Sequence, residues 1–250
     1  MSADVITKPH TRKARTKAAK PDGENVPEAL EQERPAAAPR KRMLLVASSK
    51  GGSGKTMSAL NLAVQAVHSG LRVATVDLDR QETLTKWATR RPDEAPVIDH
   101  YTIPMHRLAE GLAEVEAVSD IDLIIVDTPP GVEDHPGAVR LLLARADFCL
   151  VPTNQAPADL DSVTEWMRML KRENVPAAFM LNRTKRQTKS FERAKLHLVR
   201  SGNLCPIDVR DLEDIAALHA VGVGLREARG ARGQDDIEGV WAYVRAQLRI

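Results

Sequence analysis

The chain has 250 residues, of which 43% are hydrophobic, and a formal net charge of +2. We expect one folded domain with an appendage. No apolar run approaches the ~20 residues that span a bilayer, and the first residues lack the apolar stretch of a secretory signal. Cys149 and Cys205 form no C-x-x-C pair. This argues against a disulfide framework or a cysteine metal site and favours a cytoplasmic protein.

Residues 1–42 are predicted to form a disordered charged arm, because they are rich in Pro, Ala, Lys and Glu and lack a sustained apolar period. The arm holds ten Lys/Arg against six Asp/Glu, whereas the rest of the chain holds 26 against 28. Residues 8–20 carry six basic residues and no acid, and residues 21–33 carry five acids and no base. Two alternatives stay open: a solvated spacer that folds back on itself, or a basic arm that touches nucleic acid or an acidic partner.

Residues 43–250 are predicted to form a single α/β domain. Apolar runs typical of buried strands occur at residues 43–48, 72–77, 121–127, 147–152, 177–182 and 204–208, and a weaker strand pattern, interrupted by polar residues, occurs at 97–103. Amphipathic stretches typical of helices lie between or after them, at 55–69, 105–118, 137–145, 159–173, 189–200 and 236–249. This alternation indicates a three-layer sandwich, in which a mostly parallel twisted sheet carries helices on both faces.

The stretch K-G-G-S-G-K-T at residues 50–56 lies between the first strand and the first helix, which is the context of a phosphate-binding loop. Glycines there let the backbone aim N–H groups at phosphate oxygens, and the helix adds its positive end. Lys55 would bridge the β- and γ-phosphates, and Thr56 would give its hydroxyl to Mg²⁺. Ser49 replaces the first glycine of the strict G-x-x-x-x-G-K-[ST] pattern, so a chance glycine cluster is the alternative. The predicted binding residues are Gly51, Gly52, Ser53, Gly54, Lys55, Thr56 and Met57.

Three aspartates follow strands that are expected to be buried. Asp127 ends the strand I-I-V-D, at the sheet edge where parallel sheets bind ligands, and would hold Mg²⁺ through a bound water. Asp77 and Asp79 stand two apart in V-D-L-D-R-Q. We expect Asp77 to serve the metal or merely to end its strand. Asp79 is expected on a loop near the γ-phosphate, where a carboxylate would orient or deprotonate the attacking water.

The motifs at residues 50–56, 77–81 (D-L-D-R-Q) and 122–131 (D-L-I-I-V-D-T-P-P-G) occur in the order and spacing of the ParA/MinD family of deviant Walker ATPases. From about residue 43 to the end, the chain resembles that family, which has a SIMIBI-type P-loop NTPase fold. The resemblance implies Mg²⁺-dependent ATP hydrolysis in a nucleotide sandwich dimer, with Lys50 reaching the partner subunit's nucleotide. It also implies that Asp79 helps to activate water and that Asn182 contacts the base. Arg80 replaces the usual proline and Met57 a frequent second threonine.

Members of this family differ in what the dimer binds. ParA-like members bind double-stranded DNA non-specifically, and a ParB-like protein or a cargo adaptor triggers hydrolysis, whereas MinD-like members bind membrane through a basic C-terminal helix. Residues 182–200 carry seven Lys/Arg against Glu192 alone. This stretch is either a phosphate-attracting surface or an ordinary solvated helix face. The DNA-binding candidates are Lys185, Arg186, Lys189, Arg193 and Arg200, with Leu196 and Val199 facing inward.

The predicted last helix, at residues 236–249, has an apolar stripe but only Arg245 and Arg249 as bases, which favours docking on the core over a membrane surface. The leading hypothesis is therefore a ParA-type ATPase on the nucleoid that partitions plasmid or chromosomal DNA or positions a protein cargo. A MinD-like membrane-associated regulator, a DNA-transfer accessory ATPase and a metabolic or metal-delivery enzyme are the alternatives.

Overall fold

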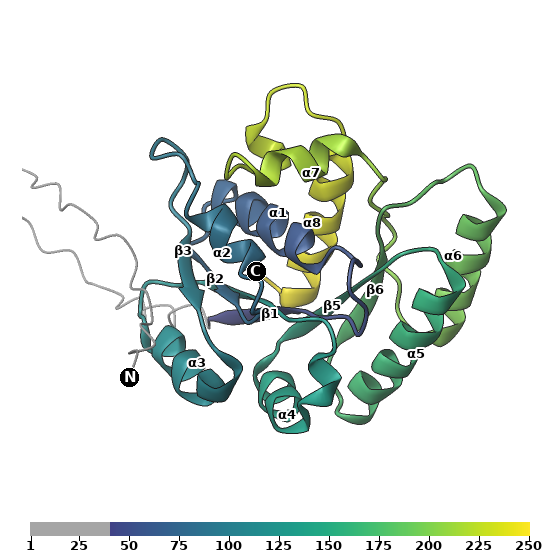
Figure 1. Cartoon of the computed structure of the whole chain (residues 1–250), viewed down its shortest axis with the longest axis horizontal. Coiled ribbons are helices and arrows are strands. Elements are labelled where there is room, and N and C mark those ends of the chain that lie inside the picture. The colour runs from purple at the N-terminus through teal and green to yellow at the C-terminus, as the bar shows by residue number, and fades with distance from the viewer. Residues whose placement is uncertain (1–40) are drawn as a thin grey trace, which may run out of the picture.

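The computed structural model describes residues 41–250, and its six strands form a single parallel sheet (Figure 1). The strand order across the sheet is β3-β2-β4-β1-β5-β6, and each pair of neighbours runs parallel. The strands are β1 (Arg42–Val46), β2 (Val73–Asp77), β3 (Asp99–Thr102), β4 (Leu123–Asp127), β5 (Phe148–Thr153) and β6 (Ala177–Leu181). The first strand is central, so the loop that follows it emerges between β4 and β5.

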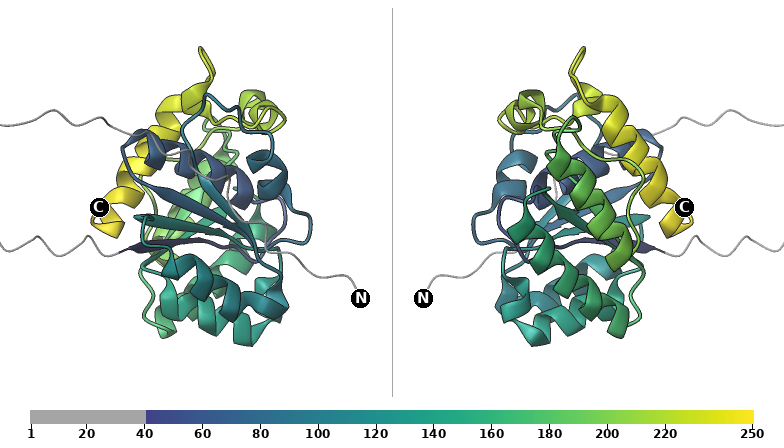
Figure 2. Two further views of the ribbon diagram at one scale, coloured as in Figure 1. Left: turned by 90° about the vertical axis from the view of Figure 1, so that its left-hand side faces the viewer. Right: turned by 90° about the vertical axis from the view of Figure 1, so that its right-hand side faces the viewer.

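Helices cover both faces of the sheet, which confirms the predicted three-layer architecture (Figures 1 and 2). One face carries α1 (Lys55–His68), α2 (Thr83–Ala88), α7 (Glu213–His219) and α8 (Gln234–Leu248). The other carries α3 (Leu108–Ala117), α4 (Pro136–Arg145), α5 (Pro157–Arg172) and α6 (Lys189–Ser201). Three short 3-10 helices complete the chain: η1 (Met105–Arg107), η2 (Val132–Asp134) and η3 (Leu225–Glu227).

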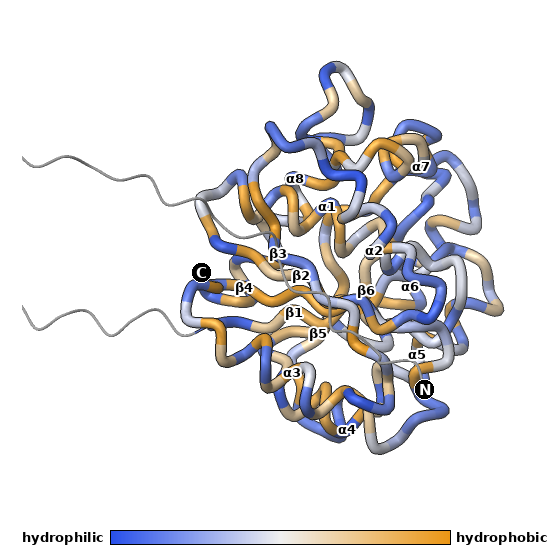
Figure 3. The backbone as a smooth tube through the Cα atoms, turned by 60° about the vertical axis from the view of Figure 1, so that its left-hand side comes forward, coloured by the Kyte–Doolittle hydropathy of each residue, from blue (hydrophilic) through white to orange (hydrophobic). Residues whose placement is uncertain are grey.

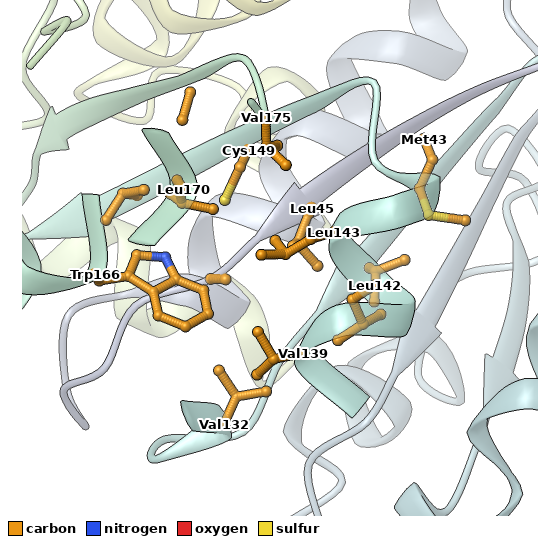
Figure 4. Close-up of a cluster of buried hydrophobic side chains, with 14 of the residues drawn as sticks. Met43, Leu45, Val132, Val139, Leu142, Leu143, Cys149, Trp166, Leu170 and Val175 are labelled. Carbon is orange, nitrogen blue, oxygen red and sulfur yellow. The ribbon is translucent and has the colours of Figure 1, made fainter. Parts of the chain in front are cut away.

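Strand β1 shows why a continuous apolar run forms a central strand. Met43 and Leu45 point into the core under α3 to α6, whereas Leu44 and Val46 point into the core under α1 and α8. Leu45 lies beside Leu143 of α4 in Figure 4. Apolar colour follows the central strands in Figure 3, while the outer loops are largely polar. Burial on both faces holds the carboxyl ends of these strands at one edge of the sheet.

The structure departs from the sequence expectations at three elements. Residues 204–208 are not a strand, and that prediction was wrong: within the described residues only an isolated parallel bridge joins Leu204 to Phe179, and the next backbone bond to β6 comes from Val209, so the regular ladder breaks after Cys205. Helices α2 and α7 were missed because six and seven residues are too few to display a helical period.

The boundary of the predicted arm is also earlier than expected. Arg42 begins β1, and the Lys41 ammonium donates to the carbonyls of Glu116 and Val118 at 2.6 Å each, at the end of α3. The expectations for residues 1–40, disorder and contact with nucleic acid or a partner, lie outside the described residues.

Candidate nucleotide-binding site

The loop after β1 leaves its backbone donors open. Gly54 has a left-handed backbone (φ 90°) and leads directly into α1. A Cβ atom there would collide with the Asn182 side-chain nitrogen, so only glycine fits. Within the described chain, no backbone N–H of residues 50–52 or 54–57 donates to a protein group, and the turn over Gly51 and Gly52 is closed at Ser53. Such a row of unpaired donors at a helix N-terminus is a binding site for an anion.

The two lysines of the loop have different surroundings. Lys55 is 6% exposed, and its ammonium donates to the Lys50 carbonyl at 3.0 Å. Burial lowers the pKa of Lys55, and the nearby Asp127 and Asp79 carboxylates oppose this shift. The Lys50 ammonium, by contrast, makes no hydrogen bond or ion pair to any of residues 41–250, although its main chain anchors both Lys55 and the Ser53 hydroxyl. The Lys55 ammonium is thus held inside the loop, whereas the Lys50 ammonium is left without a protein partner among the described residues.

Asp127 is a buried carboxylate that lacks a partner. It ends β4 beside Asp77 of β2 and Val46 of β1, is 0% exposed, and neither of its oxygens accepts a hydrogen bond from the described residues. Burial raises its pKa to about 8, and the nearby Thr56 hydroxyl and Lys55 ammonium offset this only in part. Unpaired buried oxygens of this kind fit a hard cation, so Thr56 and Asp127 would hold Mg²⁺, the latter through a bound water.

Asp77 and Asp79 have separate roles. β2 ends at Asp77, and Asp79 lies on the following loop, as expected. Asp77 accepts hydrogen bonds from the Asp79 amide at 3.0 Å and from the Thr85 amide and hydroxyl at 2.9 Å each. These three protein donors make Asp77 an anchor of the loop, and its predicted part in holding the metal stays a prediction. The Asp79 carboxylate accepts from the Gln81 amide at 3.0 Å and reaches the cavity described next.

A cavity of about 690 Å³ opens in front of the loop. Of the predicted residues, it is lined by Gly51, Gly52, Gly54, Lys55, Thr56, Met57, Asp79 and Asn182. Ser53 is buried behind this wall and points its hydroxyl to the Lys50 carbonyl at 3.3 Å. Sequence reasoning missed the far end of the cavity, where the lining residues are Arg183, Arg210, Asp211, Leu212, Glu213 and Ile215. Leu212 and Ile215 give this end of the cavity an apolar wall, a surface on which a planar base can pack.

Asn182 braces the phosphate loop. Its side-chain nitrogen donates to the Ser53 carbonyl at 2.9 Å, and its side-chain oxygen accepts from the Arg183 amide at 2.9 Å. Each side-chain group of Asn182 keeps further hydrogen-bonding capacity toward the cavity. A contact with the base therefore stays a prediction, beside a bracing role that the sequence did not indicate.

The basic helix α6 is rotated relative to the sequence expectation. Phe191, Ala194 and Leu198 face the core, whereas Leu196 and Val199 are 54% and 58% exposed, so their predicted inward orientation was wrong. The candidates Lys185, Lys189, Arg193 and Arg200 are exposed.

Arg186 does not belong with them. Its guanidinium pairs with Asp208 at 2.9 Å and with Asp236 at 3.0 Å, so it ties the chain to the start of α8. Its predicted DNA role stays a prediction, and it is the weakest candidate because two carboxylates already balance its charge.

Helix α2, which follows the Asp79 loop, is tied to the segment at residues 219–227. The His219 Nε2 atom lies 2.8 Å from the Thr83 carbonyl, and the Trp87 ring nitrogen donates to the Val223 carbonyl at 3.2 Å. Arg91 makes a two-pronged ion pair with Glu227 at 2.7 and 3.0 Å. Asp79 precedes α2, and Leu212 and Ile215 precede residues 219–227. Hydrogen bonds and an ion pair therefore connect the segments that follow the two ends of the cavity.

A parallel sheet, a glycine-rich loop between its central strand and the first helix, and a buried aspartate at the end of the adjacent strand define a phosphate-loop nucleotide-binding protein. Comparison with known families narrows this class. The protein-family model described as the CobQ/CobB/MinD/ParA nucleotide binding domain matches residues 44–220, and the chain belongs to this family.

Two curated proteins and one solved structure illustrate the similarity. The chain is 38% identical over 124 residues to the maintenance of carboxysome distribution protein A of Gloeobacter kilaueensis, covering 50% of this chain and 54% of that protein. It is 28% identical over 130 residues to protein virC1 of Rhizobium radiobacter, covering 51% and 55%. The chain spans about half the length of these curated relatives.

The solved structure is the septum site-determining protein MinD of Pyrococcus horikoshii OT3 complexed with Mg-ADP. It superimposes with a TM-score of 0.66 at 18% identity, covering 84% of this chain and 100% of that one. At this identity the likeness shows the fold alone.

Proposed function

We propose that the chain is a Mg²⁺-dependent ATPase that forms a dimer around ATP, binds DNA in that state, and partitions DNA or positions a cargo. The observation that carries this proposal is the different use of the two loop lysines. Lys55 is buried at the cavity wall and suits the phosphates of its own nucleotide. Lys50 lies on the same loop with an ammonium that has no partner among residues 41–250, and it suits a nucleotide held by a second subunit.

The site contains residues suited to phosphate binding, to metal binding and to activation of water. The open N–H groups of the loop and the Lys55 ammonium bind the phosphates and balance their charge. Thr56 and Asp127 would hold Mg²⁺, which would supply neutralisation of the phosphate charge. Asp79, on the loop at the cavity wall, would orient the attacking water or take its proton.

DNA binding is proposed for the outward face of α6 and the loop before it. Lys185, Lys189, Arg193 and Arg200 are exposed and would contact phosphates without reading bases. A dimer would present two such faces, so ATP would control DNA affinity without touching DNA. A partner protein of the ParB or adaptor kind would stimulate hydrolysis and release. On this proposal the protein works in the cytoplasm, on the nucleoid.

The positioning role rests on relatives and on the position of the last helix. One relative is named for the maintenance of carboxysome distribution, which supports positioning of a cargo. In α8 the apolar stripe Ile237, Val240, Trp241, Val244 and Leu248 is buried against the core. It therefore offers no apolar face for a membrane surface, and no helix within residues 41–250 is long and apolar enough to cross one.

Co-sedimentation tests the proposal. Wild-type protein is mixed with double-stranded DNA or with anionic vesicles, with ATP, with ADP or without nucleotide. We expect sedimentation with DNA only in the presence of ATP. Lys50→Ala should bind nucleotide as a monomer but lose the dimer and the DNA, whereas Lys55→Ala should lose nucleotide binding itself. Binding to vesicles without binding to DNA would refute the DNA role, and equal loss of monomer nucleotide affinity in both variants would refute the role of Lys50.

A further inference from the structure

A closed polar network lies beneath the loop that carries Asp79. The Thr85 hydroxyl, in the first turn of α2, lies 2.9 Å from the Asp77 carboxylate, 2.9 Å from His100 Nε2 and 2.9 Å from the Thr102 hydroxyl. The other ring nitrogen of His100, Nδ1, lies 3.0 Å from the Thr75 hydroxyl. The network therefore joins β2, β3 and α2 through side chains for which the phosphate chemistry has no direct use.

The roles of donor and acceptor follow from counting protons. The Asp77 carboxylate only accepts, so Thr85 uses its single hydroxyl proton toward Asp77. The Thr85 oxygen is then left as an acceptor, so His100 donates to it from Nε2. The Thr75 hydroxyl has one proton and two neighbouring acceptors, the Asp99 carbonyl at 3.2 Å and His100 Nδ1 at 3.0 Å. In a neutral ring that carries its proton on Nε2, Nδ1 can only accept, so the Thr75 proton goes to Nδ1. Burial lowers the pKa of His100 to about 4, which keeps the ring neutral at neutral pH.

The Asp77 carboxylate carries this arrangement to Asp79. One of its oxygens, Oδ2, is held by Thr85, and the other, Oδ1, accepts from the Asp79 amide at 3.0 Å. Between these two anchors the chain makes a tight turn, in which the Glu82 amide donates to the Asp79 carbonyl at 2.9 Å and Glu82 is left-handed (φ 52°). Rotation of the Asp77 carboxylate would thus displace the Asp79 main chain.

We propose that Thr85 and His100 are positioning residues for Asp79: they fix the Asp77 carboxylate, which fixes the loop that aims Asp79 at the cavity. This inference rests on the proposed role of Asp79 in hydrolysis. On this proposal Thr85 and His100, which lie outside the glycine-rich loop, influence the rate of hydrolysis. Neither lines the 690 Å³ cavity, so both act through Asp77.

Kinetics of three matched threonine variants test the proposal. Thr85→Val keeps the shape of the side chain but removes the hydroxyl, and Thr85→Ser restores the hydroxyl. Thr89→Val is the control, since among residues 41–250 that hydroxyl, at the end of α2, bonds only to the Lys86 carbonyl. We expect Thr85→Val to lower kcat about tenfold, with KM for ATP changed less than about twofold. Thr85→Ser and Thr89→Val should keep wild-type kcat.

His100 is tested in the same assay. His100→Gln keeps a donor near the Nε2 position and should retain most of kcat, whereas His100→Leu removes the donor and should lower kcat severalfold. A fall in nucleotide affinity as large as the fall in kcat would mark a merely structural role and overturn the proposal. So would unchanged kcat in Thr85→Val.

A second measurement is independent of hydrolysis. Amide hydrogen exchange in nucleotide-free protein should be faster at Asp79 in Thr85→Val than in wild type, and unchanged in Thr89→Val. If the wild type hydrolyses no ATP but exchange at Asp79 responds as expected, the proposed function fails while the positioning network stands. If exchange at Asp79 does not respond, the positioning proposal fails whatever the ATPase activity is.

Discussion

The unpaired carboxylate of Asp127 lowers the free energy of unfolding of the ligand-free protein at neutral pH by a measurable amount. Its pKa of about 8 in the folded chain lies well above the ordinary value of 3.8. The folded protein therefore holds a proton at pH values where the unfolded chain has lost it, and the free energy of unfolding falls as pH rises toward 8. Asp127→Asn removes the ionisation and should remove this loss.

The size of the effect follows from the pKa values. The raised pKa corresponds to about 4 kcal/mol of destabilisation at pH 7 relative to an unshifted carboxyl. Between about pH 6.5 and about pH 8, the wild type should lose about 1.6 kcal/mol that the variant keeps. For a domain of this size, that is a difference of about 3–6 °C in Tm.

Thermal unfolding in EDTA without nucleotide, at both pH values, measures this difference. Asp161→Asn is a matched control, because it makes the same change at an exposed position on α5 and should retain the wild-type loss. Asp77, whose pKa burial also raises, is present in every protein compared and cancels. An Asp127→Asn variant that loses as much Tm as wild type over this range would refute the reasoning. Added Mg-ADP should raise the Tm of wild type more than that of the variant.

Three further outcomes are expected. Asp79→Ala should slow ATP hydrolysis at least tenfold while leaving an ATP-bound dimer, seen as a stable larger species by size-exclusion chromatography with ATP. Arg193→Ala should weaken DNA binding and reduce its dependence on salt concentration, whereas Arg186→Ala should leave that dependence unchanged, measured by fluorescence anisotropy across a salt series. Asp236→Ala should lower the free energy of unfolding by about 2 kcal/mol in a urea titration. That variant leaves Arg186 and Arg210 without the carboxylate that both contact at 2.7 to 3.0 Å, and Asp236 is only 4% exposed.

The phosphate end of the site was predictable because its determinants are local. Gly54, Lys55 and Thr56 are consecutive in the sequence. Asp127 ends an apolar strand, and the carboxyl ends of parallel strands meet at one edge of the sheet, so it is expected beside the loop that follows β1. The opposite end of the cavity, lined by Leu212 and Ile215, was not predictable in this way. Leu212 and Ile215 reach the cavity from a segment that, within the described residues, pairs with β6 and the residues after it by isolated bridges, and no period marks them.

Helix α6 shows a second limit of sequence reasoning. Apolar residues at positions 191, 194, 196, 198 and 199 are compatible with more than one buried face. Packing against α5 selects Phe191, Ala194 and Leu198 and leaves Leu196 and Val199 outside. In the same way Arg186 looks like a surface charge until folding brings Asp208 and Asp236, 22 and 50 residues further along the chain, to its guanidinium.

The bonds between α2 and residues 219–227 constrain how the protein can be recombined with its relatives. His219 to Thr83 and Arg91 to Glu227 each join residues 136 positions apart in sequence. At Gly222 the two segments approach so closely that a side chain would meet the Arg90 backbone. A chimera that exchanges only one of these segments would inherit half of each bond and a mismatched close contact. The two segments therefore have to be exchanged together in any chimera with a relative.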